Sequence, residues 1–484
     1  MRFFEVEGVS KKTLSLIFVV KILFGLLLWS VYTFYYTDRS TADIYKYFDD
    51  SKIMFNSLFT KPLDYFQMLF GIKNDTPYFD QYYSQMNHWH TMFESNLYSD
   101  SHTIIRLNAV LRLFSFGFYN VHTVFMCFIS LIGLTAIYKT FVSFLKNKKK
   151  ELVCAIFLIP SVLFWGSGVL KEGILFFALG LLVYHFNRSI QSRFNFKSVF
   201  IIIFSAILIF YTKFYILVSL IPGMIAFFLI AKTNNMAPFI KYLLVTVTIV
   251  ILGLNMEKIF PGYDPLEILS IKQRDCIVLV NGGVVLYNDS FIIKIENDKR
   301  NEIVHLNNDK CTLKKGSKYL CWHINNMNDT LQVTNSTDTS IYTLLWDVQE
   351  AASKIKIGKL EPTFLSLLRN SPQAFFNAMF RPFLFESKSI LIFISAFENT
   401  VILLFIVFTL FFIKPLDAEE WNVFLFCFSF VFILYIIIGL TTPVLGAIVR
   451  YKTPAIPFVL ISMLLLIDKE KIVQRFPKLS KFLN

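Results

Sequence analysis

The chain of 484 residues is 55% hydrophobic and 17% charged, and it contains 55 phenylalanines. A soluble domain carries about a quarter charged residues, so this composition excludes an ordinary soluble protein and indicates a polytopic membrane protein. The formal net charge is +13, but Lys and Arg gather in short clusters between apolar runs. That pattern is typical of cytoplasmic loops rather than of a nucleic-acid-binding surface.

About ten apolar runs approach the length of a membrane span, which is about 20 residues. They lie near residues 14–36, 118–145, 151–170, 172–187, 198–211, 214–231, 240–256, 391–413, 421–440 and 451–467. The first run is too long for a signal peptide and no small-residue cleavage site follows it, so we expect it to remain as the first span. These runs predict an all-α polytopic membrane protein.

The basic clusters predict the topology of the spans. With the N-terminus in the cytoplasm, the clusters at 146–150, 188–197, 232–241 and in the C-terminal tail all lie inside, as the positive-inside rule requires. Residues 37–117 then lie outside, with seven Lys and Arg against nine Asp and Glu. The compact loops and the lack of a luminal retention signal favour a bacterial inner (plasma) membrane, with both termini cytoplasmic.

Two external segments are long enough to form structure of their own. Residues 37–117 are rich in aromatic residues and Met, which predicts helices lying on the membrane surface. In residues 257–390, the stretch CIVLVNGGVVLYNDSFIIKIE (276–296) alternates like strands around an Asn-Gly-Gly turn. We therefore expect a small β-rich core over about 272–345, followed by surface helices. The predicted organisation is an N-terminal membrane region 1–256, an extracytoplasmic insert 257–390, and a C-terminal membrane region with a basic tail 391–484.

Six cysteines are present, and three of them fall in apolar runs. The other three, Cys276, Cys311 and Cys321, fall in the predicted insert. Because three is an odd number, at most one disulfide can form among them.

Four acidic residues follow the first span, in the stretch DRSTADIYKYFDD (38–50). On a helix, Asp43 and Asp50 share a face while Asp49 lies to one side. A carboxylate that faces an external cavity can accept a proton from a substrate hydroxyl. The alternative role for these acids is to cap a surface helix in contact with water.

A second group of candidate residues lies between the last two spans, in TTPVLGAIVRYKTPAIP (441–457). Arg450 and Lys452 are expected on the external side, where the positive-inside rule does not call for cations. Beside Tyr451, they can bind the phosphate of a lipid-linked donor and stabilise it as a leaving group. The alternative is an interfacial anchor that meets lipid headgroups.

Three further sites offer external charges. Lys171 and Glu172 separate two apolar runs, so they form a tight hairpin in which Lys171 can pair with Glu172 or with a substrate phosphate. Arg381 lies in the Phe- and Pro-rich stretch FRPF, and Arg106 lies on the helix predicted over 103–114. Each of these cations can bind a phosphate or serve only as a structural anchor.

The stretch HWH at 88–90 is the only hint of a metal site. Two His residues separated by one residue point the same way on a strand and can bind a metal. Asp80, Glu94 and His102 are nearby in sequence, but no third ligand is evident. We therefore expect no metal and no cofactor, and the sequence does not indicate a divalent cation.

The order of these parts resembles the GT-C superfamily of integral membrane glycosyltransferases, which includes protein O-mannosyltransferases and the lipid A aminoarabinose transferase. STADIYKYFDDSK (40–52) is similar to the first external loop of that family, and VRYKTPAIP (449–457) is similar to its Arg-Tyr/Pro pattern before a late span. Family members transfer a sugar from a polyprenyl-phosphate carrier to an acceptor outside the cytoplasmic leaflet. The chain lacks the Asp-Glu pair of the best-known members, and Asp49-Asp50 is its nearest equivalent.

The resemblance implies an inverting transfer in which an Asp of the first external loop is the base. We favour Asp43, which lies closest to the first span beside an aromatic stretch, over Asp50 and Asp49. Arg450, Lys452 and Lys171 are then expected to hold the lipid phosphate. The implied partners are a polyprenyl-phosphate-linked sugar, a glycan, lipid or protein acceptor, and the surrounding lipids, with no nucleic acid.

Two other functions remain compatible with the sequence. A polysaccharide polymerase or ligase that uses a polyprenyl-diphosphate glycan relies on external arginines, so Arg381 and Arg450 would matter more than Asp43. A transporter or flippase of lipid-linked sugars performs no covalent chemistry. Transport predicts charges in the middle of spans or matching broken helices, whereas the charges in this sequence cluster at the ends of the spans.

Overall fold

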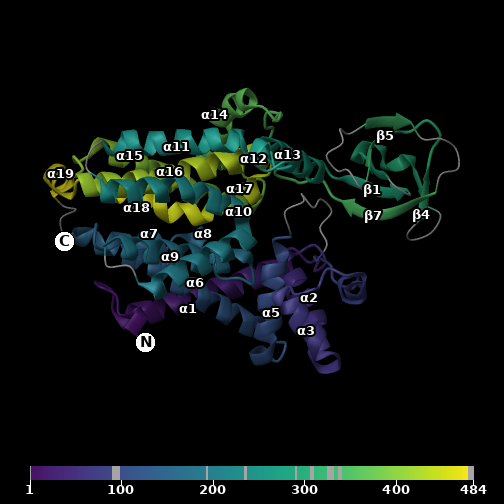
Figure 1. Cartoon of the computed structure of the whole chain (residues 1–484), viewed down its shortest axis with the longest axis horizontal. Helices are drawn as coiled ribbons and strands as arrows, with labels where there is room; N and C mark the ends of the chain where they lie inside the picture. Colours follow the sequence, from purple (N-terminus) through teal and green to yellow (C-terminus); the bar gives the residue numbers. More distant parts are fainter. Residues whose placement is uncertain are drawn as a thin grey trace. The chain divides into compact units, whose positions relative to one another are not determined.

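The computed structural model describes residues 2–89, 99–191, 195–233, 237–288, 291–305, 310–323, 332–335 and 341–477 (Figure 1). The chain forms two compact units. The first comprises Met1–Leu252, Ile394–Tyr435 and Val449–Asn484, and the second comprises Gly253–Phe393 and Ile436–Ile448. The chain is largely helical with one small antiparallel sheet, which agrees with the predicted polytopic architecture.

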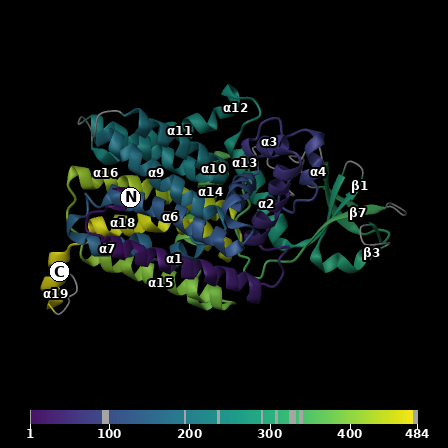
Figure 2. The same ribbon diagram turned by 90° about the horizontal axis from the view of Figure 1, so that it is seen from below.

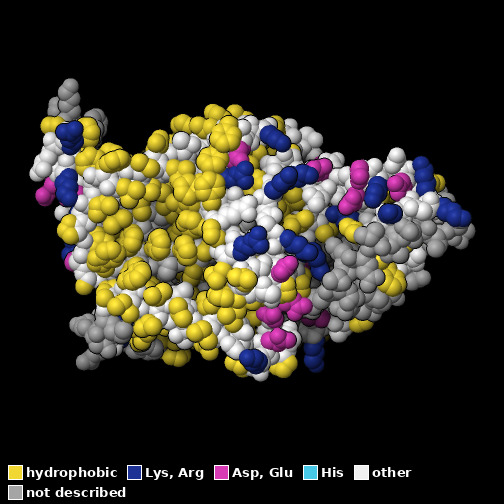
Figure 3. Space-filling view, turned by 90° about the horizontal axis from the view of Figure 1, so that it is seen from above, with side chains coloured by type: hydrophobic (Ala, Val, Ile, Leu, Met, Phe, Trp, Pro, Cys, Tyr) yellow, Lys and Arg dark blue, Asp and Glu magenta, His cyan; other side chains and the backbone are white. Residues whose placement is uncertain are grey.

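Seven helical stretches in the described part of the chain are long and apolar enough to cross a membrane. They are Lys11–Tyr35 (α1, Lys11–Ser30, with a π-helical end), Tyr119–Phe141 (α6), Lys171–Gln191 (α9), Phe196–Lys232 (α10), Ile390–Phe411 (α15), Ala418–Thr441 (α16) and Leu445–Leu466 (α17, Leu445–Lys452, and α18, Ile456–Leu466). Figures 1 and 2 show α1, α6 and α9 side by side. On one face, hydrophobic side chains gather in a broad patch over the helices (Figure 3). These features indicate a membrane-embedded protein.

The other predicted spans are also helical but shorter or broken. Residues 151–170 form α7 (Lys149–Phe157) and α8 (Pro160–Trp165). The break falls before Pro160, because a residue that precedes proline is disfavoured in the α conformation, and Ile159 is indeed extended. Residues 240–256 correspond to α11 (Pro238–Leu254).

Helix α10 folds back on itself at Lys213, where the backbone is non-helical (φ −155°, ψ 84°). Near the end of α9, His185 is hydrogen-bonded to Ser198 and the ring of Phe186 contacts Phe227. In a straight helix, Ser198 and Phe227 would be about 43 Å apart, so both contacts require a reversal between them. The two halves of α10 therefore match the two spans predicted at 198–211 and 214–231.

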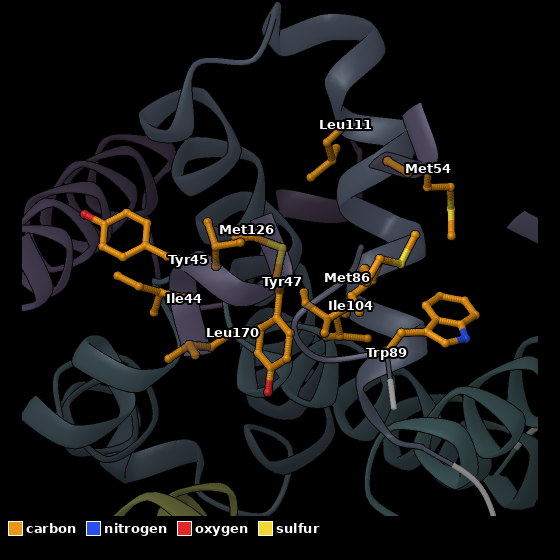
Figure 4. Packing of buried hydrophobic residues seen from close by; sticks show 14 of the residues in the cluster. Ile44, Tyr45, Tyr47, Met54, Met86, Trp89, Ile104, Leu111, Met126 and Leu170 are labelled. Atoms are coloured by element: carbon orange, nitrogen blue, oxygen red, sulfur yellow. The ribbon is translucent and has the colours of Figure 1, made fainter. Parts of the chain in front are cut away.

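The segment after the first span forms a group of short helices in the first unit. They are α2 (Asp43–Thr60), α3 (Pro62–Phe70), α4 (Asp80–Tyr83) and α5 (Ser101–Ser115). On α2, the buried residues Ile44, Tyr47 and Met54 lie toward one side at helical spacing. They pack into a core that also takes in Trp89 and residues of α1, α5, α6 and the turn before α9 (Figure 4). This core holds α2 against the membrane helices.

The second unit contains the sheet. Its helices are α12 (Met256–Ile259), α13 (Pro265–Asn281) and α14 (Phe364–Phe380). The strands are β1 (Gly283–Asn288), β2 (Phe291–Ile295), β3 (Ile303–His305), β4 (Lys310–Leu313), β5 (Lys318–His323), β6 (Gln332–Asn335) and β7 (Tyr342–Val348), in the order β3-β4-β7-β1-β2-β5-β6. Cys276, Cys311 and Cys321 are all free thiols.

One part of the β prediction was wrong. The stretch 276–281 was expected to be a strand before an Asn-Gly-Gly hairpin turn, but it is the end of α13. Asp264 caps that helix and Pro265 begins it, so the start of α13 is well defined. The β-branched residues of 276–281 continue this helix, because strand preference is weak compared with the structural context. Gly282 and Gly283, with φ of 66° and 123°, let the chain leave the helix and enter β1, which pairs with β2 instead.

A close backbone crossing of α6 and α9 generates the first prediction. A Cβ added at Gly180 would lie 2.0 Å from the carbonyl oxygen of Gly133. Gly180→Ala should therefore lower the free energy of unfolding by roughly 1–3 kcal/mol, the usual cost of overpacking. The change is measured as a lower thermal unfolding midpoint of the protein in detergent. Gly253→Ala on α11 is the control, because an added Cβ there meets nothing within 4 Å and gains helix propensity. An unchanged midpoint for Gly180→Ala would contradict the crossing.

Candidate functional site

A cluster of ion pairs centred on Arg450 lies in the first unit. Arg450, near the end of α17, donates from Nε and Nη2 to the two carboxylate oxygens of Glu172 at 2.8 and 3.1 Å. Its third donor group, Nη1, lies 2.7 Å from Oδ2 of Asp43. Arg450 therefore joins the first residue of α2 to the second residue of α9, although all three residues are more than 100 positions apart in the sequence.

Glu172 is held by a second cation. Lys213, at the reversal point of α10, lies with Nζ 3.1 Å from Oε1 of Glu172. The Glu172 side chain is 0% exposed and that of Lys213 is 5% exposed. A buried carboxylate without a partner would cost several kcal/mol, so Arg450 and Lys213 together make the burial of Glu172 possible.

Lys171 extends the cluster on the other side. Its ammonium donates to Oδ1 of Asp100 at 2.6 Å and to the hydroxyl of Ser101 at 3.2 Å, and it lies 5.2 Å from the centre of the Tyr47 ring. Exposure increases from Glu172 outward, since 33% of the Asp43 side chain and 48% of the Asp100 side chain are accessible. The cluster thus opens toward solvent at Asp43 and Asp100.

Aromatic rings surround these charges. Lys213 Nζ lies 4.1 Å from the centre of the Tyr451 ring, and the Arg450 guanidinium lies 5.5 Å from Trp165, so both cations have favourable contacts with ring faces. Tyr215 also borders the cluster, 5.9 Å from Lys213. Its hydroxyl oxygen is buried without a hydrogen-bond partner among the described residues, and so is the hydroxyl of Ser99.

The charge on Asp43 is set by Arg450. Burial alone would raise the pKa of Asp43, but the nearby guanidinium outweighs burial and lowers the pKa to about 2. Asp43 is therefore ionised at neutral pH and is a weak base while it is paired.

Two buried polar groups fix the position of α2. Asp50 accepts hydrogen bonds at 2.7 Å from the main-chain amides of Asn87 and His88, and its burial raises its pKa to about 6. Arg112 of α5 donates to the carbonyl of Phe48 at 2.6 Å. Asp50 is thus a structural residue in this arrangement, and it brings His88 beside Tyr47, with 5.5 Å between the two ring centres.

The structure brings together five of the residues selected from the sequence, namely Asp43, Lys171, Glu172, Arg450 and Tyr451. Asp49 instead forms an exposed pair with Arg39 at 2.6 Å. Asp50 has the structural role described above.

Three predicted phosphate-binding cations have other contacts. Lys452 is buried and donates to Asn399 at 2.8 Å, because residues two apart on a helix face different directions. Arg106 donates to the carbonyl of Met68 and supports the packing of α3 on α5. Arg381 belongs to the second unit, where it pairs with Glu386.

Lys213, Asp100 and Tyr215 are members of the cluster that the sequence reasoning missed. One signal was present for Lys213, which is a single charge between the apolar runs 198–211 and 214–231. A lone cation in such a place needs a buried partner. Asp100 and Tyr215 carry no comparable signal, since acids and tyrosines are common in the surrounding segments.

The HWH stretch and the acidic residues near it are only partly described. Among the described residues, no group of three or more His, Cys, Asp or Glu side chains is arranged to hold a metal ion. His102 stacks on Trp89, with 3.8 Å between the ring centres. His90 and Glu94 lie outside the described residues.

Comparisons of the chain with protein families, with curated proteins and with solved structures found no match. The ion-pair cluster centred on Arg450 is therefore the basis for the proposed function.

The pKa of Asp43 leads to a prediction for stability. Because the pKa is about 2 in the folded protein and 3.8 in an unfolded chain, the stabilisation by Arg450 is complete above pH 3.8 and is lost as the pH falls toward 2. The difference in unfolding midpoint between wild type and Asp43→Asn should be constant from neutral pH down to about 5. It should then shrink between about pH 4 and 2. A difference that is independent of pH would contradict the pairing.

The two hydrogen bonds to Asp50 lead to a second prediction. Asp50→Ala leaves the main-chain amides of Asn87 and His88 without their acceptor in a partly buried setting, which should destabilise the protein by roughly 1–3 kcal/mol. Asp49→Ala removes the neighbouring carboxylate from an exposed pair and should cost about 0–1 kcal/mol. Chemical denaturation in detergent measures both. Equal effects of the two variants would show that Asp50 does not hold the 87–88 segment.

Proposed function

We propose that this protein is a membrane glycosyltransferase that moves a sugar from a polyprenyl-phosphate donor to a hydroxyl acceptor, with Asp43 as the base. The observation that carries the proposal is the 2.7 Å contact between Asp43 and Arg450. These two residues were selected separately, as a base and as a phosphate-binding cation, from segments some 400 positions apart. A random pair of surface charges would not be expected to meet beside a buried carboxylate.

The proposed reaction is a single displacement with inversion. The acceptor oxygen forms a bond to the anomeric carbon, and its proton passes to the carboxylate of Asp43. The bond between the anomeric carbon and the phosphate oxygen breaks, and the lipid phosphate leaves with the electron pair. Arg450 and Lys213 stabilise the negative charge that develops on this leaving group.

Lys213 takes the role that the sequence gave to Lys452. It shares Glu172 with Arg450, whereas Lys452 is bound to Asn399. Lys171 contributes less to phosphate binding in this proposal, because Asp100 already balances its charge. Glu172 orients Arg450 through two parallel hydrogen bonds, which is the fixed geometry that phosphate recognition needs.

The distribution of charge supports an extracytoplasmic site. Lys171 and Glu172 begin α9, while Arg188 lies in its last turn, so the cluster and the basic residues lie at opposite ends of this helix. Two of the basic clusters also lie close together. Lys148 donates to the carbonyl of Leu464 near the end of α18, and Lys469 pairs with Glu151 of α7. With the basic end in the cytoplasm, the cluster lies at the outer leaflet, and both termini are cytoplasmic. The compact loops between the spans favour a bacterial inner membrane.

The test is a transfer assay with the purified protein in liposomes. Short synthetic donors, farnesyl phosphate carrying glucose, galactose, mannose or N-acetylglucosamine, are supplied with a detergent extract of cell-envelope acceptors, and released farnesyl phosphate is measured. Asp43→Asn and Arg450→Gln should each lower the rate by about 10²–10⁴-fold, because each removes a group that acts in the transition state.

Matched controls come from the same segment. Asp38→Asn and Arg39→Gln make the same chemical changes at exposed positions and should leave the rate unchanged. Full activity of Asp43→Asn would refute its role as the base. Loss of activity in Arg381→Gln together with tolerance at Asp43 would instead support a polymerase or ligase that uses diphosphate donors. Movement of a labelled lipid-linked sugar across the bilayer without any new glycosidic product would support a transporter.

A further inference from the structure

We propose that Asp43 occupies the place of the donor phosphate in the resting protein, and that the arriving phosphate displaces it from Arg450 and thereby frees it to act as the base. This inference rests on the proposed function and adds a mode of activation to it. The protein would carry its own internal anion, which the substrate replaces.

The charges around Arg450 support this exchange. Arg450 and Lys213 carry two positive charges, and Glu172 between them carries one negative charge. Without Asp43, this group has a net charge of +1 in a largely buried setting. Asp43 supplies the missing negative charge through its ion pair with Arg450. Lys171, the other cation near Asp43, is balanced by Asp100. A further anion at Arg450 therefore replaces the charge of Asp43.

The geometry shows which contact can be exchanged. Nε and Nη2 of Arg450 are both engaged by Glu172, whose side chain is 0% exposed. Nη1 is engaged by Asp43, whose side chain is 33% exposed and lies at the start of α2. A phosphate that arrives from the open side meets Asp43 first. The ring of Tyr215 lies 5.9 Å from Nζ of Lys213, and its buried hydroxyl has no hydrogen-bond partner among the described residues.

The exchange also resolves a difficulty in the proposed chemistry. A general base is most effective when its pKa lies near the working pH, and the pKa of the paired Asp43 is about 2. When the phosphate takes over Arg450, the main influence that lowers the pKa is removed and burial acts in the opposite direction. Asp43 then becomes a stronger base only when the donor is present.

The first experiment measures binding to the purified protein in detergent by calorimetry. The probes are farnesyl phosphate, inorganic phosphate, and farnesol as the uncharged control. Asp43→Asn should bind farnesyl phosphate on the order of tenfold more tightly than wild type, because the competing carboxylate is gone. Asp38→Asn should bind as wild type does, and Arg450→Gln should lose binding. Equal or weaker binding by Asp43→Asn would overturn the proposal.

The three probes distinguish the sources of affinity. A gain for both phosphates, but not for farnesol, is expected if the exchange concerns the anion itself. A gain for farnesyl phosphate alone still supports the exchange and shows that the lipid is needed to place the phosphate. A gain for farnesol would overturn the proposal, because removal of Asp43 would then have opened an apolar site.

A second measurement uses the wild-type protein and does not depend on the folding of any variant. The probe is farnesyl methyl phosphate, a phosphodiester that keeps a single negative charge at about pH 4.5 and therefore does not itself exchange protons. Release of Asp43 from Arg450 should raise the pKa of Asp43 enough for the protein to take up protons when this probe binds. Calorimetry in buffers of different ionisation enthalpy reports this uptake. Release of protons, or no exchange, would overturn the proposal.

These results separate the exchange from the proposed function. If Asp43→Asn binds phosphate no more tightly but loses sugar transfer, the glycosyltransferase proposal stands and the exchange is wrong. If Asp43→Asn binds more tightly and still transfers sugar, the exchange stands and Asp43 is not the base.

Discussion

The buried carboxylate of Glu172 is the constraint on which the arrangement of the first unit depends. A charge that is withdrawn from water must be paired, and Glu172 is paired with Arg450 and with Lys213. These contacts require the start of α9, the reversal of α10 and the end of α17 to meet at one point. The contacts that hold these membrane helices together are thus the same contacts that form the candidate site.

Asp43 links this bundle to the helices that follow the first span. Asp43 reaches Arg450 because the position of α2 is fixed. The apolar face of α2 packs into the core, and Asp50 and Arg112 add polar contacts. The acids of this segment therefore have different roles that follow from their surroundings. Asp49 is solvated, Asp50 is a structural acceptor, and Asp43 is the one that meets the cations.

Much of the fold could be predicted from the sequence because long apolar runs permit few alternatives in a membrane. Seven helical stretches of the described chain are long and apolar enough to cross a membrane, whereas the span predicted at 151–170 is divided into α7 and α8. The prediction failed at 276–281, where β-branched residues continue a helix whose cap and first turn were already set. Local preference at the end of an element is weak compared with an established helix and its packing, so such boundaries are hard to read from sequence alone.

The sequence by itself determined the membrane class, the approximate spans and the presence of acids and cations beside them, because hydrophobicity and charge are properties of single residues and short windows. The tertiary structure decided which of these charges meet. It selected Asp43 over its neighbours and Lys213 over Lys452, since partners such as Glu172 lie far away along the chain. Pairing of buried charges depends on three-dimensional distance and on which face of a helix a side chain occupies, and neither is a local property of the sequence.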